Sequence, residues 1–480
     1  MSTSTDPMVA AIVEEVLARL KPRLAGQAAA RHSAAAGGDG VFSTVDEAVR
    51  AAHEAQKQLE ARSLADRAEI IAIVRRLCVE RAEELGKMEF EESRIGRLEH
   101  KIDKVRMVEK VLGVEALKTE ARSDSTGLVL TEYAPFGVLA MVLPSTHGVP
   151  TMGSNAISAL AGGNVPVFSS HPLTAKSVAH AVRMFNRELE KRMGLRNLLC
   201  AVEYPTIDSV NELFRHRDVS LICVTGGGAV VQAAMQAGKR VVAAGPGNPP
   251  VVVDETADLA KAAQAIVAGA SFDNNLLCIS EKEIFVVAKV AEEFIAAMKR
   301  AGAVQLNAAQ VERLSQTVFD FEPAKNGGRP RARVKHDYVG KDAAVLAAAI
   351  GMTLPASTPL LFGETDEDHP FVQTEQMMPF VPVVRVTCID DGIRAAMKAE
   401  HGFRHTALIH SRNAENATRM ARLMRTTIFV QNAPCYASLG NGGPGFLSYS
   451  VATPTGEGVT TPLTFTRQRS MTIAGAMRII

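Results

Sequence analysis

Short apolar runs alternate with helical stretches through most of the chain, and no other feature restricts the fold as strongly. The apolar runs that predict strands are 138–143, 165–168, 198–202, 219–224 and 240–243. The stretches between them that predict helices are 152–161, 173–192, 207–216 and 229–237. Successive parallel strands need a long crossover connection, usually a helix, and parallel sheets are covered on both faces. The alternation therefore predicts an α/β fold with a mostly parallel, doubly wound sheet.

A second series of the same kind begins after a run rich in glycine and proline at residues 245–250. Its predicted strands are 251–253, 284–288, 360–362, 381–386 and 406–410, and its predicted helices are 257–270, 290–301, 342–350 and 414–423. Because glycine and proline interrupt regular structure, we expect a domain boundary at this run. Ligands should then bind in the cleft between the two halves.

The N-terminal segment differs from the rest of the chain. Asp6 can cap a helix and Pro7 suits its first turn, and apolar residues then recur at steps of three and four as far as Leu20. The residues that follow, rich in Ala, Gly and Ser as far as Gly40, are typical of a flexible linker. We therefore expect an amphipathic helix at residues 1–20 and a linker at residues 21–40. A helix this short is marginal alone in water, so it either binds a partner or folds back on its own domain.

The charge balance and the cysteines restrict the class of protein. The sequence has 53 Lys and Arg against 52 Asp and Glu, which argues against a protein built to bind nucleic acid or an anionic membrane. No apolar run approaches the roughly 18 residues that span a bilayer, and the N-terminus lacks the pattern of a secretory signal. None of the six cysteines forms a CxxC pair, which is typical of a reduced, cytoplasmic protein.

A glycine-rich loop, Thr225-Gly226-Gly227-Gly228, lies where a predicted strand passes into a predicted helix. Glycines at such a position let backbone N–H groups approach a phosphate. The six-residue dinucleotide fingerprint is incomplete, because Val231 occupies the place of its third glycine. Nucleotide binding and a tight structural turn both stay open at this point.

Cys278 is the candidate nucleophile, because it lies between a predicted helix and a predicted strand, in a loop that could line a cleft. Loops held by a rigid scaffold commonly carry reactive groups, and a thiolate attacks a carbonyl carbon readily. A buried cysteine without a chemical role is the alternative. His401 and His405 are spaced like two metal ligands on one helical turn, but the glutamate of the zinc-hydrolase motif is absent. We therefore predict no metal site.

With Cys278 and the glycine loop, further segments give the chain a resemblance to the aldehyde dehydrogenase superfamily. More narrowly, it resembles the CoA-acylating aldehyde dehydrogenases of bacterial microcompartments. The resemblance runs from about Val41 to the C-terminus. The segments that carry it are PFGV (135–138), ALAGGN (159–164), VTGG (224–227), AGPGNPP (244–250), the stretch 278–282, EQMMP (375–379), HTA (405–407) and TPTGEG (453–458).

The resemblance implies roles for individual residues. Cys278 matches the nucleophile, and His405 lies in a segment near the active site. Glu375 matches the residue that holds the nicotinamide ribose in the wider superfamily, and residues 225–227 match the loop beside the nicotinamide and its diphosphate. The positions expected to contact the cofactor are therefore Ser145, Thr146, Thr225, Gly226, Gly227 and Glu375.

Two departures from the superfamily pattern bear on the reaction. Hydrolytic relatives carry a glutamate where this chain has Ala244, and that glutamate activates water to cleave the thioester. Without it, the thiol of CoA can take the acyl group, as in the acylating branch. Many relatives carry an asparagine at the position of His147, whose ring could donate a hydrogen bond to the oxyanion in the right tautomer or when protonated.

The resemblance implies an aldehyde dehydrogenase-like fold with a doubly wound cofactor domain and an α/β catalytic domain. Residues 41–245, with part of 440–480, would form the NAD- and CoA-binding domain and an oligomerisation arm, and residues 246–440 would form the catalytic domain. The N-terminal helix on its flexible linker resembles the peptides that direct such enzymes into protein shells. Residues 7–20 would then bind shell proteins, and the enzyme would lie in the microcompartment lumen in the cytoplasm.

The expected reaction oxidises a short-chain aldehyde, propionaldehyde first and acetaldehyde second, with NAD and coenzyme A to acyl-CoA. A homo-oligomer, dimer or tetramer, is expected. Three alternatives stay open: a hydrolytic aldehyde dehydrogenase that yields a free acid, a redox-free acyltransferase, and a non-catalytic cargo or interaction protein of the microcompartment. Ala244 opposes the first, and the glycine loop with Glu375 opposes the second.

Overall fold

The computed structural model describes residues 38–322 and 331–477. The helix predicted at residues 1–20 and most of the predicted linker lie outside the described residues. The last two linker residues belong to the folded part, because the Asn186 side chain donates to the Asp39 carbonyl at 2.9 Å and Arg187 binds the Asp39 carboxylate at 2.5 Å. Residues 39–480 form one compact unit.

Four helices open this unit, and two of them begin at a capping box. Thr44 caps the first and Ser63 the second, with an acidic residue three positions later completing each box. The four are α2 (Val45–Glu60), α3 (Leu64–Glu80), α4 (Ala82–Ser93) and α5 (Leu98–Arg106). They account for the helical pattern that precedes the first predicted strand.

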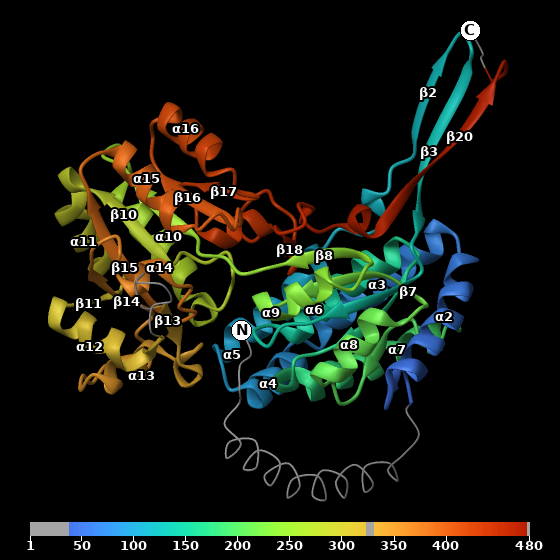
Figure 1. Ribbon diagram of the computed structural model, residues 1–480, viewed down its shortest axis with the longest axis horizontal. Coiled ribbons are helices and arrows are strands. Elements are labelled where there is room, and N and C mark those ends of the chain that lie inside the picture. The colour runs from blue at the N-terminus through green and yellow to red at the C-terminus, as the bar shows by residue number, and fades with distance from the viewer. Residues whose placement is uncertain (1–37, 323–330, 478–480) are drawn as a thin grey trace, which may run out of the picture. The chain divides into compact units, whose positions relative to one another are not determined.

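The first sheet is wholly parallel and has the strand order β1-β6-β5-β4-β7-β8. Its strands are β1 (Val41–Phe42), β4 (Val138–Val142), β5 (Val165–Ser169), β6 (Cys200–Val202), β7 (Val219–Thr225) and β8 (Arg240–Ala244). The helices between them are α6 (Gly148–Ala161), α7 (Ala175–Met193), α8 (Ile207–Arg215) and α9 (Gly228–Met235) (Figure 1). The chain builds outward from β4 through β5 and β6, then returns to the other side of β4 with β7, and ligands of open α/β sheets bind at such a reversal.

The second sheet is also wholly parallel, in the order β11-β14-β15-β10-β9-β16-β17. Its strands are β9 (Pro250–Val253), β10 (Glu283–Val287), β11 (Val304–Leu306), β14 (Leu361–Glu364), β15 (Phe380–Val386), β16 (Thr406–His410) and β17 (Ile428–Gln431). Its helices are α10 (Leu259–Ser271), α11 (Ala291–Arg300), α12 (Ala308–Val318), α13 (Ala343–Ala349), α14 (Pro370–Gln373), α15 (Ile389–Ala399) and α16 (Ala414–Met424) (Figure 1).

A three-stranded antiparallel sheet extends away from the helices of the first sheet (Figure 1). It consists of β2 (Glu120–Asp124), β3 (Gly127–Pro135) and the late strand β20 (Thr466–Ala474), which pairs with the full length of β3. Two short antiparallel pairs complete the described chain: β12 (Phe319–Glu322) with β13 (Arg331–Val334), and β18 (Val451–Ala452) with β19 (Gly458–Val459).

The predicted α/β class and parallel sheets are confirmed. Every strand and helix predicted in the two series is present, with ends that differ by a few residues. The largest difference is at α6, which begins at Gly148 rather than at 152, because Pro150 fits the first turn of a helix. The sequence did not predict β2, whose residues are all exposed and therefore carry no apolar periodicity.

Candidate active site

Four segments of the second half converge because they precede four adjacent strands. The strands β15, β10, β9 and β16 lie side by side and run in the same direction. Their amino ends therefore meet at one edge of the sheet. The residues that precede these strands are Glu375, Cys278, Gly247 and His405, in the order of the sheet. The order of the strands, rather than the order of the chain, brings them together.

Gly247 contacts both the candidate nucleophile's backbone and a histidine ring. A methyl group on its Cα would stand 2.7 Å from the carbonyl oxygen of Cys278 and 2.9 Å from Cγ of His405. Both distances are shorter than real carbon contacts, so only glycine fits beside these two neighbours. The Cys278 backbone and the His405 ring therefore both lie close to the side of Gly247 where a side chain would stand.

The thiol of Cys278 is protonated at neutral pH in this structure. The residue keeps some exposed surface. Burial of its thiol, with a smaller contribution from the negative charge of Glu375, raises the pKa to about 12, although Lys282 opposes the rise. A thiol is a weak nucleophile until it ionises, so attack on a substrate requires a positive charge or a base brought close to Cys278.

Lys282 holds the segments around Cys278 together. Its side chain is buried, and the ammonium group donates to the backbone carbonyl of Asn275 at 2.8 Å and to the side-chain oxygen of the same residue. Its backbone N–H donates to Pro249 at 3.0 Å, and its carbonyl accepts from the side chain of Gln376 at 2.9 Å. Lys282 therefore links the cysteine loop to the segments that carry Gly247 and Glu375.

The cysteine loop begins with three buried residues in the left-handed region. Asp273, Asn274 and Asn275 have φ values of 49°, 54° and 65°. Aspartate and asparagine tolerate this conformation better than other residues that carry a Cβ. The Asn275 side chain then donates to Ala270 at 3.0 Å and to Glu281 at 2.9 Å, which closes the loop on itself.

His405 is held in the neutral state. Burial, with the nearby charge of Lys282, lowers its pKa to about 4. Its backbone N–H donates to the carboxylate of Glu400 at 2.8 Å, and its Nδ1 lies 2.9 Å from the hydroxyl of Thr406. A neutral imidazole has one nitrogen with a free lone pair, so the His405 ring can accept a hydrogen bond at neutral pH.

The carboxyl edge of the first sheet supplies the second group of predicted residues. Strands β4 and β7 are neighbours, so the turn 145–147 after β4 lies beside the turn 225–227 after β7. His147 is buried at the N-cap position of α6, its ring lies 5.4 Å from that of Tyr449, and its Nδ1 has no hydrogen-bond partner. Burial and the charges of Lys104 and Lys101 hold the pKa of His147 well below its usual value.

The glycine loop faces open space at the start of α9. Gly227 is the N-cap residue, and a methyl group at Gly227 or Gly228 would meet no atom within 4 Å. The N–H groups of a helix start that faces open space fit a diphosphate. The hydroxyl of Thr225 lies 2.7 Å from that of Ser450, which fixes the start of the loop.

Glu375 suits a sugar hydroxyl. The residue is partly exposed. Burial raises the pKa of its carboxyl, while Lys282 and the N–H of Gly247 oppose that rise. With the open N–H groups of the glycine loop, Glu375 makes the described residues fit a nicotinamide dinucleotide.

Ala244 ends β8 beside Thr225, and its carbonyl accepts the N–H of Gly226 at 3.2 Å. Its methyl group cannot take a proton from water. Neighbouring Gly245 approaches Pro454, because a methyl group there would stand 2.9 Å from its ring. Position 244 therefore has no titratable group.

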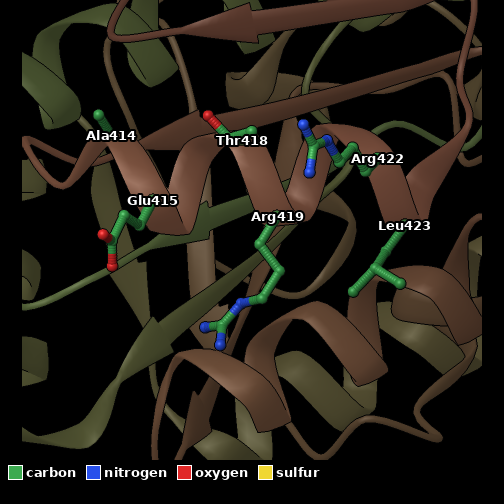
Figure 2. Close-up of a pocket in the computed structure, with 6 residues that line it drawn as sticks. All are labelled: Ala414, Glu415, Thr418, Arg419, Arg422 and Leu423. Atoms are coloured by element: carbon green, nitrogen blue, oxygen red, sulfur yellow. The ribbon is translucent and has the colours of Figure 1, made fainter.

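Other features of the described chain lie away from these groups. Residues 38–322 and 331–477 contain no cluster of three or more His, Cys, Asp or Glu that could hold a metal ion, and no helix long and apolar enough to cross a membrane. A hollow of about 580 Å³ lies on the outer face of α16 (Figure 2). It is lined by Ala414, Glu415, Thr418, Arg419, Arg422 and Leu423, none of which the sequence analysis selected.

The comparison with protein families agrees with this geometry. The model of the aldehyde dehydrogenase family matches residues 31–444. The chain belongs to the aldehyde dehydrogenase family. Among curated members of that family, it is similar to the acetaldehyde dehydrogenase (acetylating) EutE of Escherichia coli K12, with 45% identity over 92% of this chain and 94% of the relative.

Two solved structures of aldehyde dehydrogenases are similar to the chain over most of its length. The propionaldehyde dehydrogenase of Rhodopseudomonas palustris with bound propionyl-CoA has a TM-score of 0.87 and 42% identity, over 93% of this chain and 97% of that chain. The same enzyme has been solved with CoA and an acylated cysteine. The propionaldehyde dehydrogenase of the Clostridium phytofermentans fucose utilisation microcompartment has a TM-score of 0.87 and 40% identity, over 92% of this chain and all of that chain.

The sequence analysis named candidate reacting groups but missed the residues that hold them in place. Lys282 stands in a segment that supported the resemblance, yet its burial and its hydrogen bonds depend on segments far away in the chain. Lys101 and Lys104 also went unnoticed, because lysines on a short helix are usually exposed. The run Asp273-Asn274-Asn275 did offer a signal, since three such residues in succession favour a left-handed turn.

Proposed function

We propose that the protein is a CoA-acylating aldehyde dehydrogenase that converts a short-chain aldehyde, NAD+ and CoA into acyl-CoA and NADH. The observation that carries this proposal is the close approach of the Cys278 backbone and the His405 ring to Gly247, with Ala244 in place of a water-activating base. A nucleophile and a proton acceptor are present, and the base required for hydrolysis is absent.

The oxidation half of the reaction begins with attack of the Cys278 thiolate on the aldehyde carbon. Residues 225–227 would hold the diphosphate of the dinucleotide, and Glu375 would orient its nicotinamide ribose. When bound, NAD+ would supply a hydride acceptor and a positive charge that favours the thiolate. The backbone N–H of Cys278, with the unpartnered His147 ring, stabilises the oxyanion. Loss of hydride leaves an acyl thioester on Cys278.

The transfer half of the reaction consumes that thioester. The neutral His405 accepts the proton of the CoA thiol, and the resulting thiolate attacks the thioester carbon. The carbon–sulfur bond to Cys278 breaks and acyl-CoA leaves, so the enzyme follows a ping-pong scheme. The R. palustris relative, solved with CoA and an acylated cysteine, supports both the intermediate and the acceptor.

The relatives support a small aldehyde. Two of those compared are propionaldehyde dehydrogenases and one is an acetaldehyde dehydrogenase, so propionaldehyde is the first substrate to test and acetaldehyde the second. We assign residues 41–245, with part of 440–480, to cofactor binding and oligomerisation, and residues 246–440 to catalysis. The enzyme would act as a homo-oligomer, a dimer or tetramer.

The C. phytofermentans relative comes from a microcompartment, which supports the same setting for this protein. Residues 7–20 would then bind shell proteins and place the enzyme in the lumen. Deleting residues 1–20 should leave activity in solution unchanged and release the enzyme from co-expressed shells. Co-purification of the shortened protein with the shells would contradict this role.

The decisive assay follows NADH formation from propionaldehyde and NAD+, with and without CoA. We expect strong dependence on CoA, propionyl-CoA as the product, and no NADH formation by the folded Cys278→Ala variant. The variant Cys388→Ala is the matched control, because Cys388 is exposed and lies at the start of α15. Equal rates without CoA, with propionate as the product, would favour the hydrolytic alternative.

A further inference from the structure

Four charged side chains lie buried together between the turn that carries His147 and the loop that carries Cys278. They come from α4, α5 and the second residue after α10, and none is more than 1% exposed. Lys101 lies 3.2 Å from Glu89 and 3.6 Å from Asp273, and Lys104 forms an ion pair with Asp273. Two ammonium groups thus balance two carboxylates, and no charge in the cluster lacks a partner.

Both lysines point at one backbone atom of the His147 turn. The carbonyl oxygen of Thr146 accepts from Lys101 at 2.5 Å and from Lys104 at 3.0 Å. On the other side of His147, the backbone N–H of Val149 donates to Glu89 at 2.7 Å. The cluster therefore fixes the backbone before and after His147.

The His147 ring depends on that backbone for its position. Its Nδ1 has no hydrogen-bond partner, and its ring contact with Tyr449 is a tilted one at 5.4 Å. The hydroxyl of Tyr449 in turn donates to the carbonyl of Lys104 at 2.8 Å. Helix α5 thus supports both the backbone of His147 and the ring that packs against it.

The same cluster fixes the loop of the nucleophile. The carboxylate of Asp273 accepts the backbone N–H of Arg97 at 2.9 Å, and the backbone N–H of Asp273 donates to Nδ1 of His100 at 2.8 Å. Asp273 is the first of the three left-handed residues that lead to Cys278. Although burial alone would raise its pKa, Lys101 and Lys104 lower the pKa of Asp273 to about 2, so it stays ionised.

A cluster of this kind is weak evidence for added stability. Removing charges from water is costly, and apolar residues of similar size often stabilise a fold as well or better. Geometry offers a more specific reason for its presence, because this cluster joins two segments that no regular element connects directly.

We propose that Lys101 and Lys104 are positioning residues, which set the distance between the His147 turn and the Cys278 loop. This inference rests on the proposed function, in which His147 stabilises the oxyanion formed on Cys278. Loss of a lysine would then slow oxidation by displacing His147, while the reactivity of the thiol itself would remain. Burial aside, the groups with the largest effects on the pKa of Cys278 are Glu375 and Lys282 rather than Lys101 or Lys104, so the two effects can be measured separately.

The test is a double-mutant cycle on the full-length protein. We measure kcat and KM for NADH formation by wild type, Lys104→Met, His147→Ala and the double variant. Because a misplacement of about 1 Å can slow a reaction about 100-fold, each single change should lower kcat by about 10- to 100-fold. The double variant should be no slower than the slower single variant, since both changes remove the same interaction.

Controls separate positioning from loss of folding. Arg106→Met changes an exposed residue of the same helix and should keep wild-type kcat. If Lys104→Met does not fold, Lys101→Met with Glu89→Gln replaces it, because this pair removes one charge of each sign. The rate at which iodoacetamide inactivates each variant should match that of wild type.

Each outcome decides between the alternatives. Multiplicative losses in the double variant, or a wild-type kcat in Lys104→Met, would overturn the positioning role. A changed rate of inactivation by iodoacetamide would also overturn it, since the cluster would then act on the thiol. Failure of the wild-type protein to form NADH with CoA would instead refute the proposed function. The wild-type protein is therefore assayed before any variant.

Discussion

Replacing Gly247 with alanine should displace Cys278, His405 or both, because the new methyl group would stand too close to each of them. The new methyl group would stand 2.7 Å from the Cys278 carbonyl oxygen and 2.9 Å from Cγ of His405. Carbon atoms pack at about 3.5–4.0 Å, so at least one neighbour must move by roughly 0.5–1 Å. Both neighbours are tied down, Cys278 through the loop that Lys282 holds and His405 through Glu400.

The expected losses follow from that displacement. A shift of about 1 Å away from the geometry of attack can lower a rate by about 100-fold, so kcat for CoA-dependent NADH formation should fall by about 10- to 100-fold. Overpacking of a filled site destabilises by about 1–3 kcal/mol, which sets the expected loss in the free energy of unfolding. Activity should therefore suffer more than stability.

The assay combines steady-state kinetics with thermal unfolding. Gly392→Ala is the matched control, because Gly392 is buried in α15 and its added methyl group would meet Val252 at 3.3 Å and Val386 at 3.4 Å. It should keep wild-type kcat, and the better helix propensity of alanine offsets the mild crowding. A Gly247→Ala variant with wild-type kcat and an unchanged Tm would refute the reasoning, since the methyl group would then fit without displacing either neighbour.

Further predictions concern the thiol and the packing near it. The rate of inactivation by iodoacetamide should rise about tenfold per pH unit between about pH 7 and pH 10. Below a pKa of about 12, the thiolate fraction of Cys278 rises about tenfold with each pH unit. A plateau in this range would contradict the raised pKa of Cys278. Lys282→Met should slow this inactivation at fixed pH, because the charge of Lys282 favours the thiolate of Cys278. Lys289→Met, at an exposed position, should leave the rate unchanged. Equal inactivation rates for Lys282→Met and wild type would exclude that charge effect. Gly269→Ala should lower the Tm, because its methyl group would overlap the buried carboxyl of Glu281, and an unchanged Tm would show that this carboxyl can move.

Much of the fold could be predicted because its signals are local. Apolar runs alternating with helical stretches require a parallel α/β arrangement wherever they occur, and the capping residues at Thr44 and Ser63 act within one turn. The three strands of the projecting sheet, β2, β3 and β20, were not predicted in this way. Strand β20 pairs with β3 across more than three hundred residues of sequence, and β2 is exposed throughout.

The candidate nucleophile also had a local signal, because Cys278 lies in a loop between a helix and a strand. The glycine loop had one too, as a turn at a helix start. The roles expected for His147, His405 and Glu375 came from the resemblance to a family, because the residues next to them in the sequence do not indicate a role.

The sequence by itself determined the class of fold, the thiol and the absence of a base at Ala244. Only the tertiary structure decided which of these groups meet. The adjacent order of β15, β10, β9 and β16 brings Cys278 and His405 close to Gly247. Tertiary packing also buries Lys101 against Asp273, although a lysine on a short helix is usually exposed. Both results depend on contacts between distant segments, and a local pattern of residues carries no information about such contacts.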